Sequence, residues 1–377
     1  MRIKSVKILH CADLHIGDHE GIRTFETIIS LCKDEKPAIL LIAGDFFDRI
    51  NVSANIFGTV ISLISQLPDT VVAIAPGNHD PFSADSVYNI REWPENVIIF
   101  RDKLSSVILE DIGVRLWGCG FTSYYADELW QTESSENIES GDGYIEICVM
   151  HGDLASVVSS SPYNLIPQEI LKDFGFDYVA LGHVHKRTPV MKAGRTFYSY
   201  SGCPYARGFD EPGDLGVYIG EVGKSSCELR FVKTNSRRYI TEEIVIDSFG
   251  SNLSVSERII DLIRDKYPSS YAVDRFKIIV KGELPDGNMP DPFSVTDHLS
   301  KVLSEPRVEV KTIVRPDYEK LAGEGSLKGL FLGKMKARVE SAGSEEEREL
   351  ALRALEYGLK AFEGEVKIDE DNVCLDR

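Results

Sequence analysis

The sequence predicts an α/β protein whose N-terminal part contains a parallel sheet. Three apolar segments of strand length lie in the first 80 residues, at 6–10, 38–43 and 71–74, and segments with helical spacing separate them. Each apolar segment stops at a group of Gly, Asp, Asn or His residues. Strands that alternate with helices form βαβ units with parallel strands. We therefore expect the polar groups to lie beyond the carboxyl ends of neighbouring strands, where such sheets place their ligands.

The elements of this part follow from the same patterns. The first two helices are expected near 22–32 and from a cap at Ser53 to about Leu67, and Pro68 follows the second. Further strands are expected at 97–99, 107–110, 114–117, 144–150, 178–181, 196–200 and 216–222, with a weak helix at 166–174. The polar stretch 131–143 is typical of an exposed loop.

Two changes of pattern divide the chain into three predicted domains, 1–235, 236–316 and 317–377. The middle part has a β-α-β-α-β order, and none of its strands ends in an Asp or His group. The last part contains two segments with apolar residues at helical spacing, and Ser344 with Glu347 forms a possible capping box. Two amphipathic helices without a large core of their own are expected to bind a partner surface.

Composition limits the class of protein. The chain has 377 residues, 43% hydrophobic and 27% charged, which is typical of a soluble globular protein. It contains no apolar run of membrane-spanning length and no signal peptide, and its seven cysteines are scattered, so we expect a cytoplasmic protein without membrane contact. The net charge of −18 argues against a generic nucleic-acid binder. It does not exclude a nuclease whose metal ions supply local positive charge.

Five predicted strand ends carry side chains that bind metals. These are Asp13 and His15, Asp45, Asn78 and His79, His151, and His183 and His185. Imidazole suits Zn, Fe, Ni and Cu, whereas carboxylate and amide oxygens suit Mn and Mg. Any one of these groups alone would be read as a turn or a helix cap about as often as a ligand, or more often. Together they exceed the needs of one ion and fit two ions about 3.5–4 Å apart with a bridging carboxylate.

The motifs that carry these residues resemble the calcineurin-like metallophosphoesterases in order and spacing. They are Asp13-Leu14-His15, Gly44-Asp45-Phe46-Phe47-Asp48, Gly77-Asn78-His79-Asp80, His151-Gly152 and Gly182-His183-Val184-His185. The resemblance covers about the first 220 residues and implies a four-layered α/β/β/α fold with a dinuclear site. It implies one metal on Asp13, His15, Asp45 and His185, and another on Asp45, Asn78, His151 and His183. His79 would then protonate the leaving oxygen or steady the transition state.

Within that family, the segments 10–17 and 44–48 look like the DNA-repair nucleases of the SbcD and Mre-eleven type. The domain order is similar too: a phosphoesterase, a small capping domain and a C-terminal helical pair. This resemblance implies two divalent metal ions, preferably Mn²⁺, DNA as substrate, and an SMC-like coiled-coil ATPase of the SbcC or Rad-fifty type bound to the helices. It also implies a homodimer. Asp48 stands where archaeal and eukaryotic members tend to carry a second His, so the chain is nearer the bacterial branch.

Other functions remain open at this point. The same site could act on a small-molecule phosphodiester or a phosphoprotein, which the acidic composition favours. The protein could also be a scaffold for the ATPase with an idle metal site. Basic residues near the predicted mouth, Lys186, Arg187, Arg195 and Arg207, are either ordinary surface charge or contacts to a phosphate backbone. Asp48 and Arg207 are the candidates for contacts to the metal ligands or the substrate.

Overall fold

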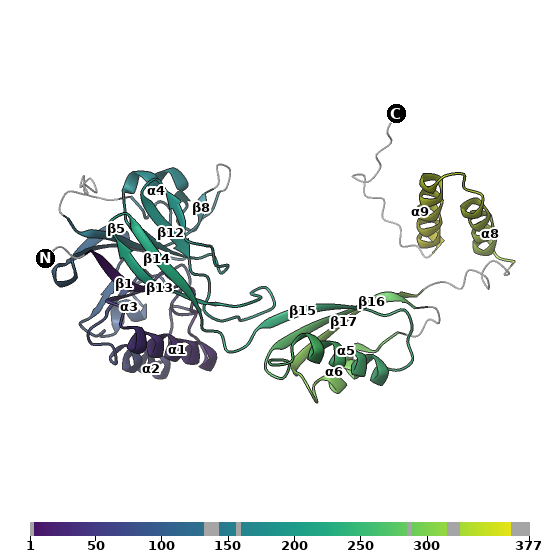
Figure 1. The fold of residues 1–377 in the computed structure, drawn as a ribbon, viewed down its shortest axis with the longest axis horizontal. Coiled ribbons are helices and arrows are strands. Elements are labelled where there is room, and N and C mark those ends of the chain that lie inside the picture. The colour runs from purple at the N-terminus through teal and green to yellow at the C-terminus, as the bar shows by residue number, and fades with distance from the viewer. Residues whose placement is uncertain (1–3, 132–142, 156–159, 285–288, 315–324, 363–377) are drawn as a thin grey trace. The chain divides into compact units, whose positions relative to one another are not determined.

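The computed structural model describes residues 4–131, 143–155, 160–284, 289–314 and 325–362 (Figure 1). The chain forms two compact units. The first is Met1–Ile240 with Ala272–Arg275, and the second is Thr241–Tyr271 with Phe276–Arg377. The predicted loop 131–143 and the predicted boundary after residue 316 fall largely or wholly outside the described residues.

The first unit contains two six-stranded sheets. One has the order β14 (Ser226–Lys233), β13 (Gly216–Gly223), β1 (Ser5–Cys11), β2 (Ile39–Ile42), β3 (Val71–Ile74) and β4 (Val97–Ile99). Strands β1 to β4 are parallel, as the βαβ pattern predicts, and β13 joins β1 in antiparallel pairing. The carboxyl ends of β1, β2 and β3 therefore lie together at one edge of this sheet.

The second sheet has the order β11 (Met191–Ala193), β12 (Thr196–Tyr200), β10 (Tyr178–Gly182), β7 (Ile145–His151), β6 (Val114–Gly120) and β5 (Asp102–Leu109). Strands β6, β7, β10 and β12 are parallel, and β5 and β11 close the edges in antiparallel pairing. Strands β11 and β14 were not expected from the sequence. Strand β14 alternates between exposed and half-buried residues at an edge, so it lacks the apolar run that marks a central strand.

Three hydrophobic cores separate four layers, which confirms the predicted α/β/β/α class. The first core lies between helices α1 (His19–Glu35) and α2 (Ala54–Ile64) and the first sheet. The second core fills the space between the two sheets with side chains such as Ile8, Leu41 and Val149. The third covers the outer face of the second sheet beneath α4 (Gln168–Phe174). The predicted cap at Ser53 is present, because its side chain accepts the backbone N–H of Ile56.

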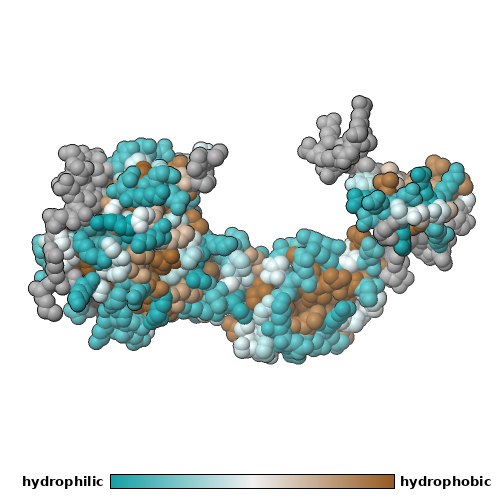
Figure 2. All heavy atoms as spheres, turned by 45° about the horizontal axis from the view of Figure 1, so that its top comes forward, coloured by the Kyte–Doolittle hydropathy of each residue, from teal (hydrophilic) through white to brown (hydrophobic). Residues whose placement is uncertain are grey.

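The second unit has a three-stranded sheet with the order β15 (Tyr239–Val245), β16 (Arg275–Leu284) and β17 (Ser304–Val314). Helices α5 (Asn252–Lys266) and α6 (Pro292–Leu299) pack on one face of this sheet (Figure 1). Apolar side chains also lie on the surface of this unit (Figure 2), and the exposed ones include Phe293 and Val245.

Helices α8 (Leu327–Glu340) and α9 (Glu345–Phe362) pack against each other. The Phe331 and Phe362 rings lie 5.6 Å apart, and Leu332 and Leu359 are buried. Other leucines of the pair are exposed: Leu327 by 74%, Leu330 by 61% and Leu350 by 68%. The pair therefore buries only part of its apolar surface. No helix in the described part of the chain is long and apolar enough to cross a membrane.

Candidate metal centre

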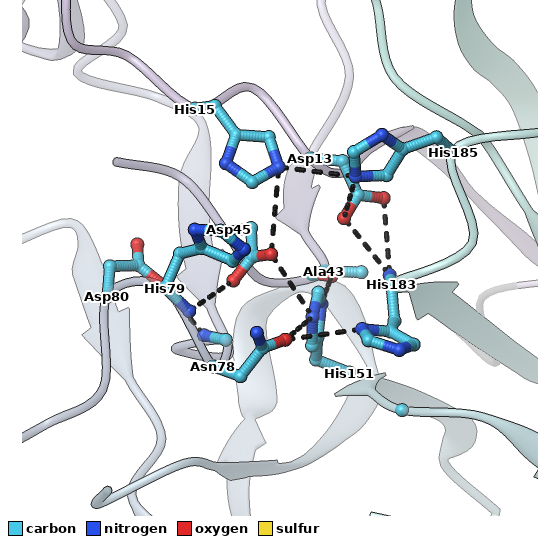
Figure 3. Close-up of polar contacts among 12 residues, drawn as sticks. Asp13, His15, Ala43, Asp45, Asn78, His79, Asp80, His151, His183 and His185 are labelled. Atoms are coloured by element: carbon cyan, nitrogen blue, oxygen red, sulfur yellow. Dashed lines mark hydrogen bonds and ion pairs between the residues drawn. The ribbon is translucent and has the colours of Figure 1, made fainter. Parts of the chain in front are cut away.

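The eight strand-end residues predicted from the sequence meet at one place between the two sheets (Figure 3). The first sheet supplies five of them: Asp13 and His15 after β1, Asp45 after β2, and Asn78 and His79 after β3. The second sheet supplies the other three: His151 at the end of β7, and His183 and His185 after β10. The centre is thus assembled from segments that are far apart in sequence.

Backbone hydrogen bonds hold the strand-end loops together. The N–H of Asp13 donates to the carbonyl of Gly44 at 3.0 Å, and the N–H of His15 donates to that of Asp45 at 2.8 Å. The N–H of His183 donates to the Asp13 carboxylate at 3.1 Å, which ties the second sheet to the first. The bonds from Asp13 and His15 continue the parallel pairing of β1 and β2 past the ends of these two strands.

Four of the predicted ligands have left-handed backbone conformations. The φ angles are 54° at Asp13, 43° at His15, 48° at Asp45 and 98° at His183. Such conformations cost about 1–3 kcal/mol each in residues other than glycine, and they concentrate at functional sites. Here they turn each chain sharply after its strand, so that the side chains point toward a common centre.

One group of donor atoms surrounds His15. Its Nε2 lies 3.3 Å from Nε2 of His185 and 3.6 Å from Oδ2 of Asp45. Nε2 of His185 lies 3.9 Å from Oδ1 of Asp13. These four side chains form the first set of ligands that the family resemblance implies.

A second group of donor atoms surrounds Asn78. Its Oδ1 lies 3.1 Å from Nε2 of His151 and 3.2 Å from Nδ1 of His183. Nε2 of His151 lies 3.5 Å from Oδ2 of Asp45. The same carboxylate oxygen of Asp45 thus lies close to an imidazole of each group, which is the position that a bridging ligand requires.

The protonation of these groups fits divalent cations. Burial lowers the pKa of His15 to about 2 and that of His151 to about 4, so both imidazoles are neutral, the form that binds metals. Burial and the charge of Asp45 raise the pKa of Asp13 to about 7, because two buried carboxylates lie together with too little positive charge. The buried Nδ1 of His15 has no hydrogen-bond partner within the described residues. A donor set of this kind is suited to bind positive ions.

Three of the histidines are oriented by further contacts. Nδ1 of His151 lies 2.9 Å from the carbonyl of Ala43, and Nε2 of His183 lies 3.5 Å from Oδ2 of Asp153. Nδ1 of His185 lies 2.6 Å from Oε1 of the buried Glu211. Contacts of this type fix the ring orientation of metal-binding histidines. Sequence reasoning missed Glu211, because nothing in the loop between β12 and β13 marks one acidic residue as buried.

Asp80 is buried next to the centre and binds the backbone of the loops that carry the ligands. Its carboxylate accepts the backbone N–H groups of Phe47 and Gly77 and the hydroxyl of Tyr88, at 2.9, 2.8 and 2.5 Å. It thereby connects the loop after β2 to the loop after β3. Burial, together with the charge of Asp45, raises its pKa to about 8.

His79 and His10 have different surroundings. His79 is exposed, and its ring lies edge-on to that of His15, with the ring centroids 4.7 Å apart. The backbone N–H of His79 donates to Oδ1 of Asp45 at 2.9 Å. It therefore lies at the centre but is accessible to a substrate. His10 is fully buried, with its ring nitrogens 2.8 Å from the Tyr178 hydroxyl and 3.2 Å from the Leu181 carbonyl, so it is a core residue.

Asp48 and Arg207 lie together beside the centre. Nη1 of Arg207 is 3.3 Å from Oδ1 of Asp48, and the same oxygen is 3.8 Å from Nδ1 of His15. Two of the other arginines expected near the site contact groups of the protein itself. The guanidinium of Arg187 stacks over the Phe231 ring at 4.0 Å, and that of Arg195 donates to the carbonyl of Gly175. Of the three arginines in that group, Arg207 is the one whose ion pair lies beside the centre.

The fold and the site together define a metallophosphoesterase domain. A model of the calcineurin-like phosphoesterase family matches residues 6–187, which contain all eight strand-end residues. Residues 6–187 therefore match the phosphoesterase family that their motifs predicted, and they contain the groups of side chains that could hold divalent metals.

Three named proteins are similar to the chain. It is 25% identical to the uncharacterized metallophosphoesterase YhaO of Bacillus subtilis, over 83% of this chain and 81% of that protein, so the similarity extends into the second unit. It is 22% identical to the SbcD component of nuclease SbcCD of the same organism, over 55% of this chain and 64% of that protein. It is 29% identical to the DNA double-strand break repair protein Mre11 of Aeropyrum pernix, over 20% of this chain and 21% of that protein.

Proposed function

We propose that this protein is a DNA nuclease that hydrolyses phosphodiester bonds with two divalent metal ions, preferably Mn²⁺. The observation that carries the proposal is the position of Asp45. Its Oδ2 lies 3.6 Å from His15 and 3.5 Å from His151, between two separate groups of nitrogen and oxygen donors. A shared carboxylate between two such groups is the arrangement of two-metal phosphoryl-transfer sites.

The ligands divide into two sets with one member in common. Asp13, His15, Asp45 and His185 form the first set. Asp45, Asn78, His151 and His183 form the second. Bound ions would polarise the phosphoryl oxygens and lower the pKa of an attacking water.

The remaining groups either act on the substrate or orient the residues that do. His79 is exposed beside His15 and is placed to give a proton to the leaving oxygen. Arg207 offers a guanidinium for a nonbridging phosphate oxygen, and Asp48 holds it in place. Glu211 accepts a hydrogen bond from His185 and keeps the Nε2 of that ring directed toward the centre.

The choice of DNA rests on the similarity to the SbcD component of nuclease SbcCD and to Mre11, and on the order of the parts of the chain. We propose exonuclease and endonuclease activity in double-strand break repair and recombination, in the cytoplasm. The net charge of −18 would repel a polyanion away from the site. Two divalent ions would reverse that field locally.

The exposed leucines of α8 and α9 support a partner. Leu327, Leu330 and Leu350 present apolar surface that the helical pair does not bury. We propose that an SMC-like coiled-coil ATPase of the SbcC or Rad-fifty type covers it, as a helix laid in an apolar groove would. We further propose a homodimer, to be tested by light scattering of the purified protein.

Mn²⁺-dependent degradation of linear duplex and single-stranded DNA tests the proposed activity. The expected result is cleavage by the wild type and a loss of roughly 10²–10⁴-fold in rate for His79→Ala, because only the proton donor is removed. His79→Ala should retain both metals by elemental analysis, whereas Asn78→Ala should weaken one. DNA that stays intact with excess wild-type protein and Mn²⁺ would refute the nuclease. Equal metal loss in both variants would refute the division of roles.

A second candidate keeps the site but changes the substrate. The acidic composition favours a small-molecule phosphodiester or a phosphoprotein, since neither needs a basic surface. Comparing kcat/KM for duplex DNA, a small diester and a phosphopeptide separates the two candidates. A value for the small diester or the phosphopeptide that far exceeds the value for DNA would favour this alternative.

A further inference from the structure

A series of aromatic rings runs from the metal centre toward solvent. The ring of Tyr163 lies 5.0 Å from that of His183, and the ring of Tyr125 lies 5.7 Å from that of Tyr163, nearly parallel at 30°. Tyr163 is half-buried, and Tyr125 is 64% exposed. The metal ligands do not need this pair, because His183 is already oriented by Asp153.

The two tyrosines come from loops that are fastened to the centre. Residues Ala126 and Tyr163 form a β-bridge, and the N–H of Asn164 donates to the Ala126 carbonyl at 2.6 Å. The buried side chain of Asn164 donates to the carbonyl of His151 at 2.8 Å. The N–H of Asp153 donates to the carbonyl of Tyr163 at 3.2 Å. The position of the ring pair relative to the metal ligands is therefore well defined.

The ring pair and the proposed proton donor lie on different sides of the centre. His79 contacts His15, which belongs to the first group of donors, whereas Tyr163 contacts His183, which belongs to the second group around Asn78 (Figure 3). If His79 protonates the leaving oxygen, the tyrosines lie beside the substituent that stays bonded to phosphorus. Tyr125, the exposed ring of the pair, is then accessible to that substituent.

We infer that Tyr125 and Tyr163 form a stacking subsite for the nucleobase on the retained side of the scissile phosphate. This inference rests on the proposed phosphodiesterase function and specifies its substrate as a nucleotide ester. Stacking on tyrosine accepts any base, because every base has an aromatic face. It also needs no positive charge, so it provides affinity for a nucleotide on a protein with a net charge of −18.

Two esters that share a leaving group test the subsite. Thymidine 5′-(p-nitrophenyl phosphate) retains a base, and methyl p-nitrophenyl phosphate does not. With Mn²⁺ present, the wild type should prefer the thymidine ester. Tyr125→Ala should raise KM for that ester roughly 5- to 100-fold. It should leave kcat and the reaction of the methyl ester unchanged, and Tyr125→Phe should behave as the wild type, since it keeps the ring.

Calorimetry of thymidine 5′-monophosphate and methyl phosphate, with the same variants and metal, measures binding without turnover. Hydrolysis of both esters without preference, or equal losses for both in Tyr125→Ala, would overturn the subsite while leaving the phosphodiesterase intact. If neither ester is hydrolysed and linear DNA also stays intact, the proposed function fails. The subsite then stands only if the nucleotide binds more tightly than methyl phosphate and Tyr125→Ala removes the difference.

Discussion

At the scale of single residues, the centre depends on side chains that touch ligands as much as on the ligands. Glu211 contacts His185, Asp153 contacts His183, and Asp80 connects two of the loops. These acidic groups have assigned partners, so they are not available as additional ligands without rearrangement. Their substitution should change metal affinity while the ligand set stays complete.

Glu211→Gln should lower metal affinity by roughly 10- to 100-fold, because the neutral amide orients and polarises His185 less well. Calorimetric titration with Mn²⁺ measures the effect. Glu228→Gln is the matched control, because Glu228 is exposed on β14, and it should bind metal as the wild type does. Unchanged affinity in the Glu211 variant would show that the contact with His185 has no such role.

His10 should make stability depend on pH. Burial lowers its pKa from 6.5 to about 3, so it is neutral in the fold, while the unfolded chain takes up a proton below pH 6.5. The stabilising contribution is thus complete above pH 6.5 and is lost as pH falls toward 3, by about 1.4 kcal/mol per pH unit.

Urea unfolding of metal-free protein at pH 7 and pH 5 tests this expectation. His15 and His151 contribute in the same direction, so the comparison must be made against a variant. His10→Asn cannot titrate in this range and should lose less stability between the two pH values than the wild type. An equal loss in both proteins would contradict the assignment.

At the scale of elements, the approach of the strand-end loops depends on glycine. A Cβ atom on Gly77 would lie 2.1 Å from Oδ1 of Asp45, and one on Gly44 would lie 2.1 Å from Nδ1 of His151. The loops after β2 and β3 and the end of β7 therefore pack with no room for a side chain at these two positions. These two glycines are therefore required by close contact with the predicted ligands.

Gly77→Ala should displace Asp45 and reduce the binding of metal at both groups of donors, because Asp45 is close to both. A destabilisation of about 1–3 kcal/mol is expected from the overpacking. Elemental analysis and thermal unfolding measure the two effects. Gly58→Ala is the control, because a Cβ there has no atom within 4 Å and alanine favours helix α2. Full metal content in Gly77→Ala would contradict the argument.

The helices and strands were predictable where the local pattern of apolar residues determines them. The site residues were predictable where they directly follow a buried strand. Strands β3, β4 and β12 have the expected bounds, and Asp45 and His183 lie where the ends of buried strands place them. Glu211 and Tyr163 were not predictable. They lie in loops whose positions depend on hydrogen bonds to other segments, such as the bond from Asn164 to His151. The spacing of apolar residues in the sequence does not predict such bonds.

At the scale of the whole molecule, hydrolysis and partner binding should be separable. The metal centre lies in the first compact unit, and the exposed leucines of α8 belong to the second. The leucines are not part of the metal centre, and the metal ligands are not part of the helical pair. A change on the helices should therefore leave hydrolysis of a small diester intact.

Leu330→Glu should weaken binding of the proposed SbcC-type ATPase at least roughly tenfold, because a charge would be buried in an apolar contact. Surface plasmon resonance with the full-length chain measures it. Lys334→Glu, also exposed on α8, controls for the added negative charge. If Leu330→Glu binds the ATPase as the wild type does, the exposed leucines are not its docking surface.

The division of the ligands between two sheets also determines when the centre can form during synthesis. Asp13, Asp45 and Asn78 leave the ribosome early, but His151, His183 and His185 follow only after most of the first unit has been made. Asp13 and His183 are 170 residues apart in sequence. A nascent chain that ends before His151 therefore offers four of the seven proposed ligands and lacks all three that the second sheet supplies. Metal loading is then a late event that requires a nearly finished domain, and a bound ion fastens the two sheets to each other.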